Sequence, residues 1–239
     1  MAVTNRPKHL NYTLHGWSNL NYPDFDFTII DDFSGNPEIE SVVNTFKDKL
    51  PITFYKEPGW MNMCRIWNKY GKASRGDYVV FAMMDEIISH GDILQKMMDC
   101  SQEARTSIFT YFMSQEETLA LDTWNWMGNP ASIVRPHSDQ TTAGLISHIT
   151  GNFRKNWDWF GWFRDEQFGH LWLDQDVHLR EVALGRNYTL CAHTPKDVWC
   201  LHQFHFPSVD TPAGWMRPGY HYANELQARL LEPAKRDIA

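Results

Sequence analysis

Two carboxylates stand two positions apart in the third quarter of the chain, at Asp174 and Asp176. Arg180 and Gly185 follow them, and a helix is expected over residues 174–184. Free N–H groups and the helix dipole stabilise charged carboxylates at a helix N-terminus, and a general base or a cation ligand must carry such a charge. Alone, the pattern is more typical of a capped, solvated helix start. Its weight therefore depends on the motifs that precede it.

Acidic pairs also follow two stretches that favour β-strands in the first half of the chain. Asp31-Asp32 follows the apolar residues 25–30, and Asp85-Glu86 ends the apolar run of residues 78–84, which is typical of a strand buried on both faces. In sheets with parallel strands, ligands bind at the carboxyl ends of the strands. Acids at two such ends indicate a ligand site. Taken separately, Asp31-Asp32 would also fit a turn, and Asp85-Glu86 would also fit a helix N-terminus.

Alternating strand-like and helix-like segments in the first half predict a mainly parallel sheet with helices on both faces. A helix is expected to start at Asn36, whose side chain can cap it, with proline at the first helical position. Strands are expected at residues 25–30, 51–55, 78–84 and 106–113, and further helices at 61–74 and 90–100. The later half is less regular, and there we expect helices over 174–184 and 222–231, a strand near 188–192 and a loop over 207–219.

Composition limits the class of protein. With 239 residues, 43% hydrophobic and 21% charged, the chain suits one sizeable globular domain. A formal charge of −7, with no basic run longer than a pair, argues against tight binding of duplex nucleic acid. The eleven tryptophans fit either core packing or a stacking surface for sugars or bases. Four cysteines without C-x-x-C spacing predict buried, reduced thiols, and the lack of a signal peptide or long apolar run predicts a soluble, cytoplasmic protein.

Taken in order, the motifs resemble those of inverting family 2 glycosyltransferases, which have the GT-A fold, and the resemblance covers about residues 25–205. In the first half, residues 27–34 match the strand that ends in D-D-x-S, Asn68 with residues 76–79 matches N-x(7)-G-[DE]-Y, and residues 83–86 stand in the place of D-x-D. In the second half, residues 163–168 match G-x-F-D-E-x-F with one extra residue, and residues 174–185 match D-x-D-L-x-x-R-x(4)-G. His202 falls where the family often has a late histidine.

The resemblance implies an α/β, Rossmann-like GT-A domain over residues 1–205, with a mainly parallel central sheet flanked by helices. Its nucleotide-binding half would cover about residues 20–115 and its acceptor half about residues 116–205. Residues 206–239 would form a C-terminal loop and helix packed on the same domain.

The resemblance also implies roles for single residues. Asp174 would be the general base, Asp176 would orient it or the acceptor, and Arg180 would hold Asp176 one helical turn on. The nucleotide-sugar site would be formed by residues of the first half, namely Asp31, Asp32, Ser34, Arg65, Asn68, Met84 and Asp85. A divalent metal, Mn²⁺ or Mg²⁺, would neutralise the diphosphate leaving group and would be held by Asp85, Glu86 and His202.

One position departs from the family pattern. Met83 stands where the first acid of D-x-D is expected, and a thioether does not suit a hard cation, which prefers oxygen ligands. Metal use is therefore expected to depend on Asp85, with Glu86 as a second oxygen donor. His202 lies among apolar residues, so it also fits a structural histidine.

The expected function is transfer of a sugar from a nucleotide-sugar donor, by default a UDP-sugar, to an acceptor hydroxyl with inversion. Saccharides and lipid-linked glycans are the family's common acceptors, and a modified base in DNA, as for phage-type transferases, is an alternative that the acidic charge disfavours. Because of Met83, a nucleotide-sugar-binding protein without turnover is a further alternative. A nucleotidyltransferase is disfavoured, because residues 31–37 offer no Gly-rich, basic phosphate loop.

Overall fold

The protein is described by a computed structural model that covers residues 1–88, 91–104, 108–109, 111–114, 149–164, 177 and 199–202. The segments expected near residues 188–192, 207–219 and 222–231 lie outside these ranges, as does the helix expected over 174–184, apart from Val177. The division into a domain over residues 1–205 and a C-terminal extension stays a prediction.

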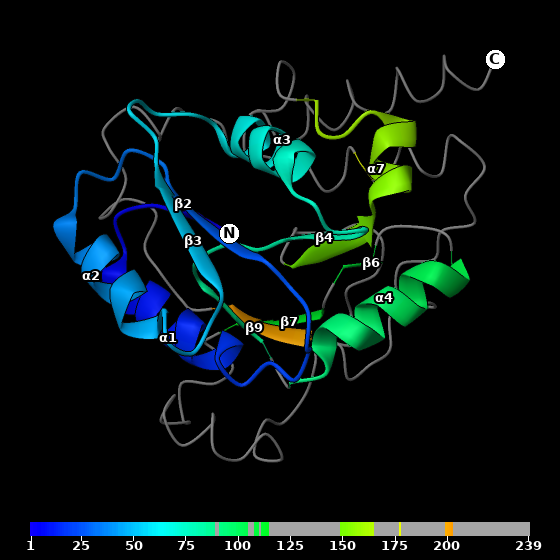
Figure 1. Ribbon diagram of the computed structural model, residues 1–239, viewed down its shortest axis with the longest axis horizontal. Helices are drawn as coiled ribbons and strands as arrows, with labels where there is room; N and C mark the ends of the chain where they lie inside the picture. Colours follow the sequence, from blue (N-terminus) through cyan, green and yellow to red (C-terminus); the bar gives the residue numbers. More distant parts are fainter. Residues whose placement is uncertain are drawn as a thin grey trace.

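The N-terminal half forms a parallel sheet. Strands β1 (Ala2–Val3), β2 (Phe27–Asp31) and β3 (Ile52–Lys56) pair in the order β1-β2-β3. An isolated parallel bridge joins Ala2 to Met83, so the chain after β4 (Tyr78–Phe81) lies on the other side of β1. The carboxyl ends of these segments therefore meet at one edge (Figure 1).

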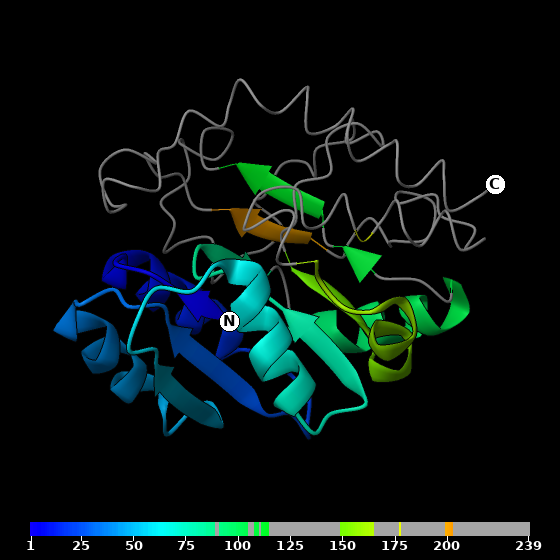
Figure 2. The same ribbon diagram turned by 90° about the horizontal axis from the view of Figure 1, so that it is seen from above.

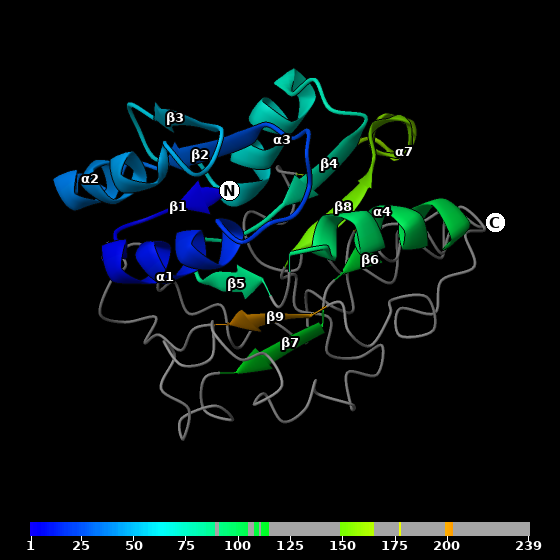
Figure 3. The same ribbon diagram turned by 60° about the horizontal axis from the view of Figure 1, so that its bottom comes forward.

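Helices cover both faces of this sheet. Helices α1 (Pro7–Trp17), α2 (Pro37–Phe46) and α4 (Ile93–Ala104) share a core cluster with Ile29 of β2. Helix α3 (Met63–Ala73) shares a second cluster with Ile30, the next residue of the same strand, and lies on the opposite face (Figure 3). Alternation of side chains along β2 thus divides the core into two layers. No helix among the described residues is long and apolar enough to cross a membrane.

Beyond β4 the strand pairing is mixed. Strands β4, β8 (Thr150–Phe153) and β6 (Ile108–Phe109) form an antiparallel sheet in the order β4-β8-β6. Strand β9 (Trp199–His202) lies between β5 (Glu86–Ile88) and β7 (Tyr111–Ser114), antiparallel to the former and parallel to the latter. Figure 2 shows β7 and β9 side by side, and helix α7 (Arg154–Phe160) next to β8.

The expected elements of the first half are confirmed, with differences in extent. Asn36 caps α2 by accepting from the Glu38 N–H at 2.9 Å, as its sequence predicts. The apolar run of residues 78–84 forms a strand only as far as Phe81, and then turns. The single strand expected over 106–113 is instead two strands in different sheets. Helix α1 was not predicted.

The described tryptophans mostly serve the core. Trp67, Trp157 and Trp162 pack with Phe81 in the second cluster, where the Trp67 and Phe81 ring centroids are 5.1 Å apart. Trp157 and Trp162 stack at 5.8 Å, so the stacking role for ligands does not apply to them. Trp159 is half exposed. Cys64 and Cys100 are buried thiols that form no disulfide, as predicted for the cysteines.

This aromatic cluster leaves no room at Gly71 of α3. A Cβ there would lie 2.7 Å from the Trp162 ring and 2.8 Å from the Phe81 ring. Alanine normally gains about 1 kcal/mol over glycine inside a helix, but overpacking a rigid core costs about 1–3 kcal/mol. We therefore expect Gly71→Ala to lower the free energy of unfolding by about 1–2 kcal/mol in urea titration.

Gly59→Ala is the matched control, because a Cβ at Gly59 meets no atom within 4 Å. Its free energy of unfolding is expected to stay within about 0.5 kcal/mol of the wild type. An unchanged or higher stability of Gly71→Ala would contradict the packing described for this cluster.

Candidate active site

Four chain segments meet at the carboxyl edge of the parallel sheet. They follow β1, β2, β3 and β4, and comprise residues 4–6, 32–36, 57–62 and 82–86. Segment 3–6 contacts the turn after β2, because the Asp32 N–H donates to the Val3 carbonyl at 3.0 Å and the Asn36 side chain donates to Asn5 at 3.0 Å. Arg6 joins it to Asp85, whereas residues 57–62 are joined to the turn after β2 through Asp31 and Asp32. This edge holds five buried acidic side chains, those of Asp31, Asp32, Glu57, Asp85 and Glu86.

Asp31 shapes the turn after β2. Its Oδ1 accepts from the Ser34 N–H at 3.0 Å, and the Ser34 hydroxyl in turn accepts from the Asn36 N–H at 3.3 Å. Phe33, between them, has a left-handed backbone with φ of 58° and an exposed ring. The turn-forming role considered for the acidic pair is therefore real for Asp31 and Ser34, and it holds Asp32 in place.

Asp32 is the carboxyl group of this turn with the most unusual electrostatics. Asp32 is only 5% exposed, and its Oδ1 accepts from the Met61 N–H at 2.6 Å. Burial raises the pKa of Asp32 to about 6, helped by the nearby charges of Glu57 and Asp31 and opposed by the Met61 hydrogen bond. Near neutral pH this group can thus accept or donate a hydrogen bond, as recognition of a nucleobase or ribose requires.

Glu57 is a buried acid that the sequence interpretation missed. It accepts from Lys69 Nζ and from the Tyr70 hydroxyl, both at 2.6 Å, and these bonds lower its pKa. Its N–H donates to the Asp31 carbonyl at 2.9 Å, which brings it beside Asp32. The available signal was its position two residues after the expected strand 51–55, because acids that follow a strand also identified Asp31-Asp32.

Arg6 is the second missed residue. Its Nη1 lies 3.5 Å from Asp85 Oδ2, and the two side chains are 9% and 3% exposed. The preceding segment is held by the Thr4 N–H, which lies 3.1 Å from the Met84 sulfur. Removing one partner of such a buried pair leaves an uncompensated charge. The sequence signal was Pro7 at the start of α1, which fixes where the chain leaves β1.

Glu86 and Met84 face inward. Glu86 is fully buried and its Oε2 accepts from the Met83 N–H at 2.8 Å. Burial raises the pKa of Glu86 well above its usual range, and the adjacent Asp85 charge adds to this, so a neutral carboxyl group is favoured. Met84 belongs to the first core cluster, and its carbonyl accepts from the Thr13 hydroxyl at 2.7 Å. Both residues position Asp85 and present little surface to a ligand.

His202 comes close to Asp85 through strand pairing. Strand β9 places its backbone directly opposite Glu86 of β5, so two residues expected to share a metal are brought together by the fold; the His202 side chain is outside the described set. Within the part of the chain that the structure describes, no group of three His, Cys, Asp or Glu residues could hold a metal ion. Among those residues, Asp85 offers the most suitable oxygen donor.

The predicted residues on α3 have different roles. Asn68 is fully engaged with Phe163, donating to its carbonyl at 2.7 Å and accepting from its N–H at 3.0 Å. Asn68 therefore links its own motif on α3 to the motif that begins at Phe163. Arg65 is exposed on the same helix.

Asp174, Asp176 and Arg180 lie outside the described residues. Val177, within their motif, is helical and fully buried in the second core cluster, which also contains Ile30 next to Asp31.

Comparison with solved structures identifies the fold. S. aureus TarS 1-349 in complex with UDP-GlcNAc matches with a TM-score of 0.65 and 13% identity, over 96% of this chain and 63% of that one. The mannosyltransferase PcManGT from Pyrobaculum calidifontis, in complex with GDP-Man and Mn²⁺, matches with a TM-score of 0.60 and 16% identity, over 96% of this chain and 60% of that one. The chain thus spans less than two thirds of their length.

No protein-family model matches the sequence, and no curated protein sequence matches it. At these low identities the structural likeness shows the fold alone. The expected α/β GT-A fold is confirmed, and the carboxyl edge of its parallel sheet is the candidate active site.

The raised pKa of Asp32 predicts a pH-dependent loss of stability. Since its pKa is about 6 when folded and ordinarily 3.8, the folded state binds more protons between these values, and the free energy of unfolding falls as pH rises through this window. Asp32→Asn keeps an oxygen for the Met61 N–H but cannot ionise. Relative to the wild type, we expect the free energy of unfolding of Asp32→Asn to be about 1 kcal/mol higher at pH 7.5 than at pH 4, after allowance for solvent screening. Urea titration of both proteins at the two pH values measures this difference.

The exposed Asp48→Asn variant controls for loss of a negative charge and should show no such gain. If Asp32→Asn and the wild type had parallel stability profiles between pH 4 and 7.5, the account of Asp32 would be wrong.

Proposed function

We propose that the chain is a glycosyltransferase that moves a sugar from a nucleotide-sugar donor, first of all a UDP-sugar, to an acceptor hydroxyl with inversion. The observation that carries the proposal is the meeting of Asp32 and Asp85 at one sheet edge, linked by segment 3–6, in a GT-A fold. The two solved neighbours are in complex with UDP-GlcNAc and with GDP-Man.

The nucleoside end of the donor would lie at Asp32 and Glu57. Both acids are buried beside the turn after β2 and carry different protonation tendencies, since the pKa of Asp32 is raised and that of Glu57 is lowered. An ionised carboxylate accepts from a base N–H or a ribose hydroxyl, and a protonated one can also donate. Ser34 and Asp31 would support this site through the turn.

The diphosphate end would lie at Asp85 and Arg6. Arg6 already neutralises Asp85 in the structure, and a guanidinium can donate to phosphate oxygens in a paired geometry. A divalent cation held by Asp85 and His202 would neutralise charge on the leaving group. Asp85 suits a hard cation as an oxygen donor, and the pairing of β5 with β9 supports His202 as its partner. Glu86 is the weaker candidate because its carboxyl group is turned toward Met83.

Asp174 would take the proton from the acceptor hydroxyl, Asp176 would orient it, and Arg180 would hold Asp176. Burial of Val177 in the cluster that includes Ile30 supports a location of this motif near the acidic edge. The hydrogen bonds between Asn68 and Phe163 also support this location, because they hold the segment that starts at residue 163, just before the Asp174 motif, against α3. A base on the opposite side of the sugar from the diphosphate gives inversion.

A nucleotide-sugar-binding protein without turnover is the second candidate. It is favoured by Met83 in the place of an acid and by the inward orientation of Glu86, which together leave few oxygen donors for a metal. For the acceptor, saccharides and lipid-linked glycans remain the first classes to test. Retention of DNA that carries a hydroxylated base on filters, lost at modest salt, would instead favour a nucleic-acid acceptor.

The test is turnover of UDP- and GDP-sugars with Mn²⁺, followed as release of nucleoside diphosphate with and without acceptor. We expect Asp174→Asn to lower turnover by about 10²–10⁴-fold, the range for loss of a general base, with donor affinity little changed. Asp48→Asn, on the surface, should retain wild-type rates. Full turnover by Asp174→Asn would exclude this residue as the base. Tight donor binding by the wild type without any turnover would favour the binding protein.

A further inference from the structure

A cavity of about 790 Å³ lies at the amino edge of the sheet, at the other end of the strands from the candidate active site. Residues 24–28, which lead into β2, form one side of it, and residues 74–81, which lead into and include β4, form the other. None of the five buried acids of the carboxyl edge lines it. Sites for small organic molecules usually have volumes of about 300–1,000 Å³, so this cavity has the size of such a site.

Buried aromatic side chains form much of the inner wall. Trp17 of α1 and Trp67 of α3 line the cavity from the two layers of the core, and they are 3% and 1% exposed. Phe27 of β2 and Phe81 of β4 line it from the strands on either side and are buried as well. Aromatic walls favour an apolar body and, over a ring face, a cation.

The two indole groups of this wall have unused hydrogen-bonding capacity. In the part of the chain that the structure describes, the Nε1–H groups of Trp17 and Trp67 have no hydrogen-bond partner. A buried donor without a partner is costly, and an acceptor atom of a bound molecule would satisfy it. Donors of this kind disfavour a cationic group deep in the cavity, so the positive charge of a ligand would belong at the mouth.

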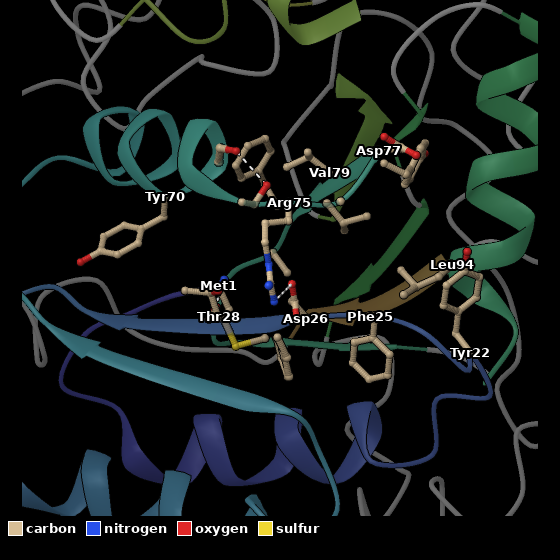
Figure 4. Close-up of a pocket in the computed structure, with 18 of the residues that line it drawn as sticks. Met1, Tyr22, Phe25, Asp26, Thr28, Tyr70, Arg75, Asp77, Val79 and Leu94 are labelled. Atoms are coloured by element: carbon tan, nitrogen blue, oxygen red, sulfur yellow. Dashed lines mark hydrogen bonds and ion pairs between the residues drawn. The ribbon is translucent and has the colours of Figure 1, made fainter. Parts of the chain in front are cut away.

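The mouth of the cavity is acidic. Its exposed lining residues include three carboxylates, Asp24, Asp26 and Asp77, and a single basic side chain, Arg75, among those that the structure places there. Arg75 Nη2 lies 3.4 Å from Asp26 Oδ2, and Figure 4 shows the two side chains reaching toward each other. They are 85% and 61% exposed, and an ion pair so exposed is weak. Within the described residues, Asp24 and Asp77 take part in no ion pair.

We propose that this cavity binds an organic ammonium ion, whose aromatic or alkyl body lies against the two tryptophans and whose positive charge lies at the mouth beside the three carboxylates. Charge selects the head group, because an anion of the same shape would meet three acids and one arginine. The Arg75–Asp26 pair opens at little cost when a ligand cation replaces the guanidinium. The inference rests on this cavity and does not depend on the proposed function.

The test compares three probes that share a phenyl ring and a four-carbon chain: 4-phenylbutylamine, 4-phenylbutanol and 4-phenylbutyrate, each titrated into the whole chain by calorimetry. We expect the amine to bind at least about tenfold more tightly than the alcohol, and the carboxylate to bind most weakly. Combining Asp24→Asn with Asp77→Asn should remove most of the preference for the amine and leave the affinity for the alcohol unchanged. Asp48→Asn, exposed and outside the cavity, is the matched control and should change none of the affinities.

A second variant tests the location. Leu94 is half-buried and lines the cavity (Figure 4), so the larger side chain of Leu94→Trp would fill part of the space. The amine and the alcohol should each lose at least about tenfold in affinity. Equal affinities of the wild type for the amine and the carboxylate would overturn the charge selection. Failure of the amine to bind at millimolar concentration, or binding that neither the Asp24 and Asp77 variant nor Leu94→Trp weakens, would overturn the site itself.

Discussion

Burial of five acidic side chains at one edge of a sheet is the constraint on which the structure depends. A buried carboxylate costs several kcal/mol unless it is paired or hydrogen-bonded. The fold meets this cost with long-range donors: Met61 for Asp32, Lys69 for Glu57 and Arg6 for Asp85. Each donor comes from a different segment, so the loops after the strands cannot move independently without exposing or unpairing a charge.

The two-layer core supports this edge mechanically. Consecutive residues of β2 belong to different clusters, Ile29 to the layer of α1 and α2 and Ile30 to that of α3. The carboxyl end of β2 is thereby fixed from both sides, and Asp31 and Asp32 emerge at a defined position. Asn68 extends the second layer to Phe163. Packing energy gained in the core is thus what holds charged groups close together at the edge.

Local patterns predicted the parts of the fold that local physics determines. The cap at Asn36 and the apolar strand before Asp31 were correct because each depends on neighbours in the sequence. Arg6 was missed because its partner Asp85 lies far away in the sequence and the two pair only in the folded chain. Glu57 follows an expected strand, but its bonds to Lys69 and Tyr70, which show that it is a buried acid, also form only on folding. Glu86 shows the same limit. Its place next to Asp85 in the sequence suits a metal ligand, but in the folded chain its carboxyl group is buried and turned toward the Met83 N–H.

The most direct test of the converging edge is hydrogen exchange measured by mass spectrometry with and without a UDP-sugar and Mn²⁺. The account predicts slower exchange together in residues 31–36, 57–62 and 82–88, three separate segments, of which the first and third are joined through segment 3–6 and the second bonds to Asp31 and Asp32. The Asp85→Asn variant should lose the Mn²⁺-dependent part of this protection. Protection confined to one of these loops, or found only in segments away from this edge, would contradict the claim that they form one donor site.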